Sequence, residues 1–521
     1  MKDFIQRFLL AGLLALVLFS CEKPDAPGPD VPEVPEVPEV PEVPEVPEVN
    51  KPALYENLFA KTLLDYYYLW KKDIAGELDN WQMDGNAEKQ VRDARYKDPA
   101  SGREIDHWTT YYSDYKSFTD YLVGEDESGT FGFSYKLYYY DNKGSRIVAV
   151  VTYTCAGGPA EAAGLKRGDM IMEVNGRKML SSNYLDAANA LSGAGHLTVT
   201  LRDGRTMELD SVHMYEDPVL LYEVLPSESG KVGYLCYTQF TGESCSRLIE
   251  ACASFRKEGI SDLILDLRYN PGGSAYVEEL LASMLAPEAE VEAGNVLGWT
   301  IYNDEWMEYY AALGEETKSC FKQDFKFDYF SKSYEFSTRG ANVRVGRLFV
   351  IVESGSTSAS EALICHLKAY MPVVLIGSRT GGKYCGGFPC SAESFYDSSA
   401  DELGAEAAAE GRKYTENKGI YLMSFRFADR NGVTLCQPDG IEPDVPIYDN
   451  PFDGYELGDL NETMLAAALE AAGYKLSKPT KSGPSVPVCL TPVPGAARRE
   501  GYYVSLDVPG RNLPLSRAKM R

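Results

Sequence analysis

The residues best suited to covalent chemistry lie in a serine-rich segment at 353–361, which reads ESGSTSASE. The segment follows an apolar run and opens a helix-like stretch, 358–370. A hydroxyl at such a junction lies beside unpaired helix N-terminal N–H groups, which suits a nucleophile whose product is an oxyanion. Serine is also a preferred N-cap residue, so the segment alone leaves catalysis and capping open. It is not the G-x-S-x-G elbow of α/β-hydrolases, because Ser356 and Ser360 flank Ser358.

A lysine and two glycine-rich turns could complete such a site. Residues 266–273 read DLRYNPGG, and residues 377–383 read GSRTGGK. A serine needs a base that is unprotonated near neutrality, whereas a lysine in water has a pKa of ~10.4. Lys383 follows an apolar strand, 373–376, and a glycine turn. Burial there would lower its pKa until it accepts the Ser358 proton. Without the other two segments, Lys383 would be interpreted as a solvent-exposed lysine in a loop.

The three segments resemble, in order and spacing, the C-terminal processing, or tail-specific, serine peptidases. The string GIEPDV at 440–445 also matches that family's G-[IV]-x-P-D motif. Together with a PDZ-like region, the resemblance covers about residues 51–472. It implies a serine-type peptidase that uses a Ser–Lys dyad, and the matching positions here are Ser358 and Lys383.

The same resemblance implies an oxyanion hole and shows one departure. The hole would combine the N–H of Ala359 with a backbone N–H of Gly272 or Gly273, where the missing side chains permit close approach. Many members of the family carry a Gln four residues after the Lys, which orients the amine, and here that position is Gly387. The amine of Lys383 is therefore either positioned by another group or held less firmly.

A second resemblance concerns residues 158–176, which read GPAEAAGLKRGDMIMEVNG. The string resembles PDZ domains, especially those of bacterial proteases, and the likeness extends over about 126–212. Such domains add the C-terminal end of a polypeptide as a strand to a sheet edge and capture its carboxylate with backbone N–H groups. The alternative is that the glycines of the loop only shape a turn. The candidate capture loop consists of Gly129, Thr130, Phe131, Gly132 and Phe133.

The pattern of elements agrees with these resemblances. Residues 51–126 have helical periodicity, and β-rich runs at 131–140 and 145–154 flank a turn cluster. Beyond about residue 225, strands and helices alternate, which indicates α/β architecture. We therefore expect a multidomain α/β protein. Its parts are a helical N-terminal domain, a β-rich α+β PDZ domain, and an α/β peptidase core of the tail-specific protease, crotonase-like type.

The N-terminus has the layout of a bacterial secretion signal. Basic residues precede an apolar run, 8–19, which is too short to span a bilayer comfortably. Residues 18–21, LFSC, resemble a lipobox, in which Cys21 is diacylated and becomes the new N-terminus. A plain signal peptide with a chance cysteine is the alternative. Six VPE triplets follow at 31–48 and enforce an extended polyproline II stalk of ~3.1 Å per residue.

Composition excludes several classes of function. The protein has 521 residues, more than one hydrophobic core holds, and 44% are hydrophobic, too many for a disordered chain. Lys and Arg number 51 against 77 Asp and Glu, and the net charge of −26 disfavours nucleic acid as a partner. The four histidines are scattered and no C-x-x-C pair occurs, so we predict no structural metal and no cofactor.

We expect an endopeptidase that is lipid-anchored in the outer membrane, facing the periplasm or the exterior, and that binds unfolded or C-terminal polypeptide segments. Gly387 leaves open a binding or scaffolding lipoprotein with a decayed core. Retention of both Ser358 and Lys383 disfavours a likeness to the retinoid-binding relatives of this fold. The expected divisions are a signal peptide at 1–20, a Pro-rich spacer at 21–50, the helical domain at 51–125, the PDZ domain at 126–215, the peptidase core at 216–475 and an extension at 476–521.

Overall fold

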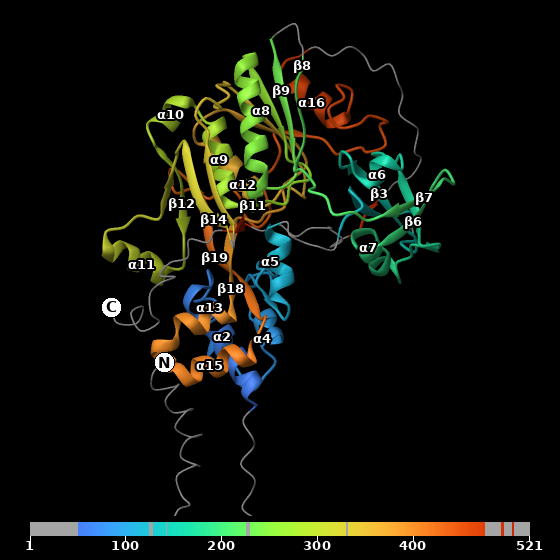
Figure 1. Cartoon of the computed structure of the whole chain (residues 1–521). Coiled ribbons are helices and arrows are strands. Elements are labelled where there is room, and N and C mark those ends of the chain that lie inside the picture. The colour runs from blue at the N-terminus through green and yellow to red at the C-terminus, as the bar shows by residue number, and fades with distance from the viewer. Residues whose placement is uncertain are drawn as a thin grey trace, which may run out of the picture.

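The structure, a computed structural model, describes residues 50–123, 129–141, 143–225, 230–329, 332–474, 491–493 and 503–504. Figure 1 shows an α/β body at the top, a mainly helical part beneath it and a smaller β-rich lobe to one side. The predicted signal peptide, Cys21 and the spacer lie outside the described residues, as does most of the extension. In the part of the chain that the structure describes, no helix has the length and apolar character needed to cross a membrane.

The body is built on a six-stranded sheet in the order β20-β17-β16-β10-β9-β8. Neighbouring strands are parallel except β8 and β9. Leu263 and Leu265 of β10 share a hydrophobic cluster with α8, α9 and α12, while Ile264 between them packs in a cluster with α16. The predicted α/β alternation is confirmed. The bounds are β8 Val219–Leu225, β9 Val232–Tyr237, α8 Cys245–Glu258, β10 Asp262–Asp266, α9 Ala275–Leu285, β16 Leu348–Val352, α12 Ala359–Lys368, β17 Val373–Gly377, β20 Val445–Pro446 and α16 Thr463–Ala471.

A second sheet joins distant parts of the sequence in the order β11-β22-β18-β19-β12-β13, and β1 also pairs with β19. In Figure 1, β18 and β19 run from the body down into the helical part. The bounds are β1 Thr110–Tyr112, β11 Gly273–Ser274, β12 Val296–Ile301, β13 Lys318–Cys320, β18 Cys385–Ser391, α13 Ala392–Ser398, α14 Ala400–Leu403, α15 Ala405–Tyr414, β19 Gly419–Asp429 and β22 Tyr503–Val504. The body also contains η1 Gly242–Ser244, α10 Glu288–Glu292, α11 Asp304–Leu313 and the hairpin of β14 Asp324–Tyr329 with β15 Lys332–Ser337.

The N-terminal region is helical, as predicted, but it has no separate core. Phe59, Leu63 and Leu64 of α2 belong to the same hydrophobic cluster as the buried residues of β19 and α12. The short strand β1 pairs antiparallel with β19. The apolar face of α2 is therefore buried against a strand that lies about 360 residues later in the sequence. The helices are α2 Lys51–Tyr67, α3 Ala75–Asp79, α4 Ala87–Asp93 and α5 Tyr115–Val123.

The β-rich lobe forms a third sheet, in the order β21-β2-β3-β4-β6-β7, with β5 paired to β4. It has its own hydrophobic cluster, which includes Phe133, Ile147 and Leu191. The predicted hairpin is confirmed, because β2 and β3 pair antiparallel. The bounds are β2 Phe133–Tyr139, β3 Ile147–Thr154, α6 Pro159–Ala162, β4 Met170–Val174, β5 Arg177–Lys178, α7 Tyr184–Ser192, β6 His196–Leu201, β7 Thr206–Asp210 and β21 Thr491–Pro492.

Candidate active site

Ser358 lies at the strand-to-helix junction that the sequence predicts. The backbone leaves β16 at Val352 and enters α12 at Ala359, so Ser358 occupies the N-cap position. Its backbone has φ 63° and ψ −115°, a conformation that residues with a side chain rarely adopt. Strain of this kind persists where the surrounding structure imposes it, and it is concentrated at functional sites.

The serines around Ser358 make structural hydrogen bonds, whereas Ser358 does not. Ser356 Oγ donates to the carbonyl oxygen of Leu267 at 2.7 Å, and Ser360 Oγ donates to that of Asn270 at 2.9 Å. The Ser358 hydroxyl is buried and has no hydrogen-bond partner among the described residues. Two serines therefore tie this segment to the 266–273 segment, and the third keeps a free hydroxyl between them.

Glu361 joins the serine segment to the lysine segment. Its Oε2 accepts hydrogen bonds from the N–H of Ser358 at 3.0 Å and from the N–H of Lys383 at 2.9 Å. Its Oε1 accepts from the N–H of Gly382 at 2.8 Å and from Thr380 Oγ1 at 2.5 Å. Burial raises the pKa of Glu361, although these hydrogen bonds act to lower it. Sequence reasoning missed this role, which the S-x-x-E spacing after Ser358 could have indicated.

Lys383 is fully buried, as the sequence predicts. Its Nζ lies 5.1 Å from the centre of the Trp108 ring and 5.3 Å from that of Tyr421. Trp108 comes from the N-terminal region, and its backbone N–H donates to the buried carboxylate of Asp106 at 2.9 Å. The helical part thus supplies one wall around the amine, which sequence reasoning did not identify.

The glycine that replaces the family's Gln has a structural reason. Gly387 lies at an irregularity where β18 pairs with β19. A Cβ at this position would overlap the carbonyl oxygen of Leu422 and lie 2.7 Å from Cε of Met423. No side chain fits there without a shift of the backbone, so a Gln could not orient Lys383 from this position.

The glycines of the predicted oxyanion hole lie against the nucleophile. A Cβ on Gly272 would lie 2.8 Å from Cβ of Ser358 and 3.0 Å from N of Ala359, so only glycine permits this approach. The Gly272 N–H, however, donates to Asn270 Oδ1 at 2.9 Å. The Ala359 N–H belongs to the first turn of α12, where intrahelical acceptors are lacking. Gly273 and Ala359 are therefore the better pair of candidate donors.

The predicted carboxylate-capture loop is tied to neighbouring segments. The N–H of Thr130 donates to the carbonyl oxygen of Val212 at 2.9 Å, and the N–H of Gly132 donates to Thr130 Oγ1 at 3.0 Å. Thr130 Oγ1 also donates to the carboxylate of Glu216. Phe131 and Phe133 point into the lobe's core. Two of the loop's N–H groups thus already have acceptors.

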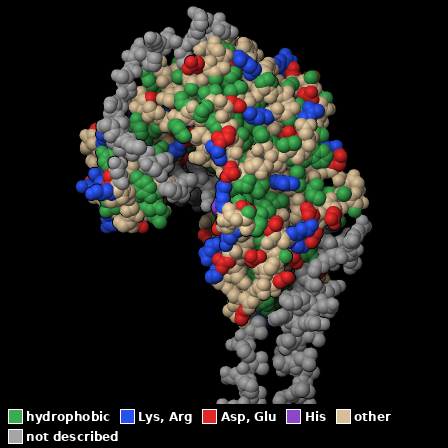
Figure 2. All heavy atoms as spheres, turned by 180° about the vertical axis from the view of Figure 1, so that it is seen from behind, with side chains coloured by type: hydrophobic (Ala, Val, Ile, Leu, Met, Phe, Trp, Pro, Cys, Tyr) green, Lys and Arg blue, Asp and Glu red, His purple; other side chains and the backbone are tan. Residues whose placement is uncertain are grey.

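A buried ionic cluster connects the PDZ-like lobe to the body. Arg167 of the lobe donates to the hydroxyl of Tyr269 at 2.6 Å and to the carboxylate of Asp449. Arg268 lies beside it, fully buried, and pairs with Glu462 at 2.7 Å. Burial acts to raise the pKa of Asp449, but the two guanidinium groups hold that pKa well below its usual range. In Figure 2 the lobe projects from the body, and a hollow lies beside it.

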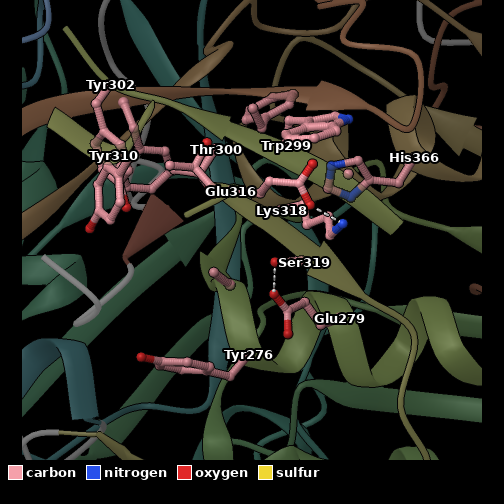
Figure 3. Close-up of a pocket in the computed structure, with 15 residues that line it drawn as sticks. Tyr276, Glu279, Trp299, Thr300, Tyr302, Tyr310, Glu316, Lys318, Ser319 and His366 are labelled. Carbon is pink, nitrogen blue, oxygen red and sulfur yellow. Dashed lines mark hydrogen bonds and ion pairs between the residues drawn. The ribbon is translucent and has the colours of Figure 1, made fainter. Parts of the chain in front are cut away.

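A cavity of about 190 Å³ lies further along α12, lined by β12, β13, α9 and β19. Figure 3 shows Trp299 and His366 on one side of it and Tyr276 and Glu279 on the other. His366 Nδ1 lies 3.1 Å from Glu278. Burial alone would lower the pKa of His366, but the Glu278 carboxylate raises it above the usual value. None of the predicted catalytic residues lines this cavity.

Comparison with known proteins agrees with the fold and with the predicted class of enzyme. Residues 231–447 match peptidase family S41, and residues 150–202 match the PDZ domain. A probable CtpA-like serine protease of Staphylococcus aureus strain MSSA476 is 26% identical over 440 residues, which cover 82% of this chain and 73% of the relative. A carboxyl-terminal-processing protease of Picosynechococcus sp. is 26% identical over 233 residues, which cover 44% of this chain and 49% of that protein.

A solved structure has the same overall fold. A putative S41 protease from Bacteroides fragilis superposes with a TM-score of 0.58 at 22% identity, covering 80% of this chain and 97% of that one. The fold and the family matches together define a serine-type peptidase of the C-terminal processing class that carries a PDZ domain. The region that resembles peptidase family S41 is residues 231–447, which include both Ser358 and Lys383.

Proposed function

We propose that this protein is an endopeptidase tethered to the cell envelope, which binds unfolded or C-terminal polypeptide segments and cleaves them with Ser358 and Lys383. One observation carries the assignment of the dyad. The free, buried hydroxyl of Ser358 stands on a strained backbone whose N–H shares one carboxylate oxygen of Glu361 with the N–H of Lys383. Glu361 thereby holds the backbones of the proposed nucleophile and base in a fixed relation.

The surroundings of Lys383 support its role as a base. Full burial of Lys383 disfavours its charged ammonium form. The ring faces of Trp108 and Tyr421 favour the ammonium, each by about 2 kcal/mol when desolvated. A base in this role has to be neutral before it accepts the proton of Ser358, and burial of the amine favours that neutral form.

Cleavage then proceeds by acyl transfer. Ser358 Oγ bonds to the scissile carbonyl carbon as its proton passes to Lys383, and the oxyanion is stabilised by the N–H groups of Ala359 and Gly273. When the C–N bond breaks, the ammonium of Lys383 gives its proton to the leaving amine. A water molecule, deprotonated by Lys383, attacks the ester in the second half, and the proton returns to Ser358 Oγ as the acid product leaves.

The PDZ domain would recruit the polypeptide by strand addition to β2. The loop from Gly129 to Phe133 is the proposed site for a terminal carboxylate. Binding of a free-acid peptide should then be tighter than binding of the same peptide amidated at its C-terminus. Equal affinities would reject the loop as a carboxylate site and favour recognition of internal segments.

The tether would be a lipid on Cys21, with the VPE stalk as a spacer that places the peptidase on the periplasmic or outer side of the outer membrane. The lipobox-like segment directly before the Pro-rich stretch supports this proposal. Metabolic labelling with a fatty acid tests it. Label that is lost in Cys21→Ser supports lipidation, whereas a wild-type protein without label contradicts it.

The alternative, a binding protein with a decayed core, rests on Gly387. The structure weakens that argument, because Gly387 has no room for a side chain and Lys383 is enclosed by other residues. Incubation with an unstructured polypeptide, followed by mass spectrometry of the products, separates the two functions. We expect cleavage by the wild type and none by Ser358→Ala. Cleavage by both at equal rates would refute the assignment of Ser358, and inertness of both would favour the binding protein.

A further inference from the structure

The protein's own C-terminal extension enters the candidate active site. The strand β22 lies between β11 and β18 and is parallel to both. Its Tyr503 pairs with Gly273, and its Val504 pairs with Ser274 and with Gly387. Because no other described strand links β11 to β18 in this sheet, β22 fills a position that would otherwise be a gap between two strand edges.

Both edges that β22 contacts belong to the catalytic segments. β11 begins with Gly273, one of the two candidate oxyanion donors, and β18 begins two residues after Lys383. A peptide that is to be cleaved must place a carbonyl group within reach of Ser358 Oγ and of these N–H groups. A strand added between β11 and β18 lies along that path.

The same extension also occupies the peptide-binding edge of the PDZ domain. The strand β21 pairs antiparallel with β2, with Thr491 opposite Tyr139 and Pro492 opposite Tyr138. Val493 follows, and its N–H donates to the carbonyl oxygen of Leu137 at 3.0 Å. The Val493 side chain is 7% exposed and belongs to the hydrophobic core of the lobe. This is strand addition with a buried apolar anchor, the mode in which PDZ domains hold peptides.

Both places are occupied by parts of one short segment of the chain. Ten residue steps separate Val493 from Tyr503, and ten extended residues span at most ~33–36 Å. Along the sequence, the segment at the PDZ edge precedes the segment in the catalytic groove. A substrate held by its C-terminus would have the opposite order, so the extension crosses the two places in the reverse direction. A tethered segment is also present at an effective concentration on the order of millimolar, which no dilute substrate reaches.

We propose that the segments 491–493 and 503–504 are a substrate-like ligand held in cis, which occupies the PDZ edge and the catalytic groove until a polypeptide substrate displaces it. This inference rests on the proposed function of the groove. The enzyme is then self-restrained, and its apparent affinity for substrate is reduced by the fraction of molecules whose groove is free. If that fraction is one-tenth, KM is raised about tenfold while kcat is unchanged.

The test is a proline at Val504 in the full-length protein. Proline lacks the N–H of a strand residue and is excluded from the interior of a sheet. Val504→Pro should lower KM for an unfolded polypeptide several-fold and leave kcat unchanged. Val486→Pro, the same substitution in the same extension but outside the segments 491–493 and 503–504, is the matched control and should behave as the wild type. Equal KM values for wild type and Val504→Pro would overturn the proposal.

A second measurement keeps this result separate from the fate of the dyad. Hydrogen exchange is compared between Ser358→Ala and Ser358→Ala/Val504→Pro, so that no cleavage is needed. Residues 385–391 should exchange faster in the double variant, because β18 loses a neighbouring strand. Unchanged exchange would show that the extension does not occupy the groove. If hydrogen exchange changes but the wild type cleaves no polypeptide, the extension does occupy the groove. In that case the assignment of Ser358 and Lys383 as a catalytic dyad is wrong.

Discussion

Two buried glutamates stand at the starts of helices on opposite sides of the sheet, and their surroundings differ. Glu361, in the first turn of α12, accepts hydrogen bonds from three backbone N–H groups and one hydroxyl, all of them uncharged, and burial raises its pKa. Glu462, the N-cap of α16, faces Arg268 and Arg167. Burial acts on Glu462 too, but the two guanidinium groups outweigh it and lower the pKa.

The difference separates a reactive region from a structural one. In the proposed active site, a guanidinium next to Lys383 would disfavour any ammonium that forms there during proton transfer, and neutral donors avoid this conflict. At the junction with the PDZ domain no proton has to move, so fixed opposite charges can hold the two parts together. Charged pairs of this kind are costly to bury, and they are most costly when one partner is removed.

The largest expected effect is on catalysis. Ser358→Ala and Lys383→Ala should each lower kcat/KM by about 10³-fold or more, because each removes a group that acts in proton transfer or bond formation. The double variant should be little worse than either single one, since the two residues act as a unit. The decisive measurement is kcat/KM on an unfolded polypeptide, with circular dichroism to verify the fold.

Ser356→Ala and Ser360→Ala are the matched controls. Each removes a hydroxyl that donates to a carbonyl oxygen of the 266–273 segment. A loss of about 1 kcal/mol in unfolding free energy is expected for each, with cleavage retained. If either control were as inactive as Ser358→Ala, the identification of the nucleophile would fall.

The next effect concerns stability at the junction. Arg268→Met should lower the unfolding free energy by about 3–5 kcal/mol, because Asp266 and Glu462 would remain buried without their main partner. Urea unfolding measures it. Arg339→Met is the control, since Arg339 pairs with Asp324 on the surface with 64% of its side chain exposed, and a change of no more than about 1 kcal/mol is expected. Similar losses for both would mean that the cluster contributes no special stability.

Glu361→Gln sharpens the comparison on the catalytic side. A Gln side chain offers one oxygen and one NH₂ group, so two of the four donors around Glu361 would lose their acceptor, whichever way the amide is turned. Hydrogen bonds to charged groups are worth about 1.5–3 kcal/mol each. We expect kcat/KM to fall by about tenfold or more in a protein that remains folded. Wild-type activity would show that Glu361 does not position the dyad.

The two glutamates should also give opposite dependences of stability on pH. The folded-state pKa of Glu361 is raised, so its contribution is present at low pH and is lost as the pH rises from about 4.5 through the folded value. The pKa of Glu462 is lowered, so its contribution is present above about 4.5 and is lost as the pH falls through the folded value. The free energy of unfolding, measured with urea at a series of pH values, should rise less toward low pH in Glu361→Gln than in the wild type. In Glu462→Gln it should fall less toward low pH than in the wild type. If the free energy of unfolding depended on pH in the same way in both variants, the expected difference between the two glutamates would be contradicted.

The features that depend on residues close together in the sequence could be predicted from sequence patterns. The apolar strand, the serine-rich turn and the helix around Ser358 follow from periodicity and capping residues, and the structure has them in that order. The burial of Lys383 follows from the apolar strand before it. The α/β core and the PDZ domain are predicted from strings with specific glycine spacing, and the family matches support both.

Contacts between residues that are far apart in the sequence could not be predicted from it. Nothing near Trp108 indicates that it encloses a lysine 275 residues later (383 − 108), because that contact depends on β1 pairing with β19. The N-terminal helices read as a separate domain since their apolar faces are visible in the sequence but the surface that covers them is not. The pairing of the extension with β11 and β18 is equally invisible, since backbone pairing leaves little trace in side-chain patterns.

The smallest expected effect concerns Trp108, the residue of the N-terminal region that lies beside the amine of Lys383. Trp108→Leu removes one ring face that favours the ammonium of Lys383 while it keeps the amine among apolar groups. The amine then loses its proton more easily, so the acid-side limb of kcat/KM should move to lower pH by up to about 1.5 pH units. Trp299→Leu, which changes a ring at the separate cavity, should leave the profile unmoved. A shift to higher pH in Trp108→Leu would mean that the indole excludes water from the amine more than it stabilises the charge.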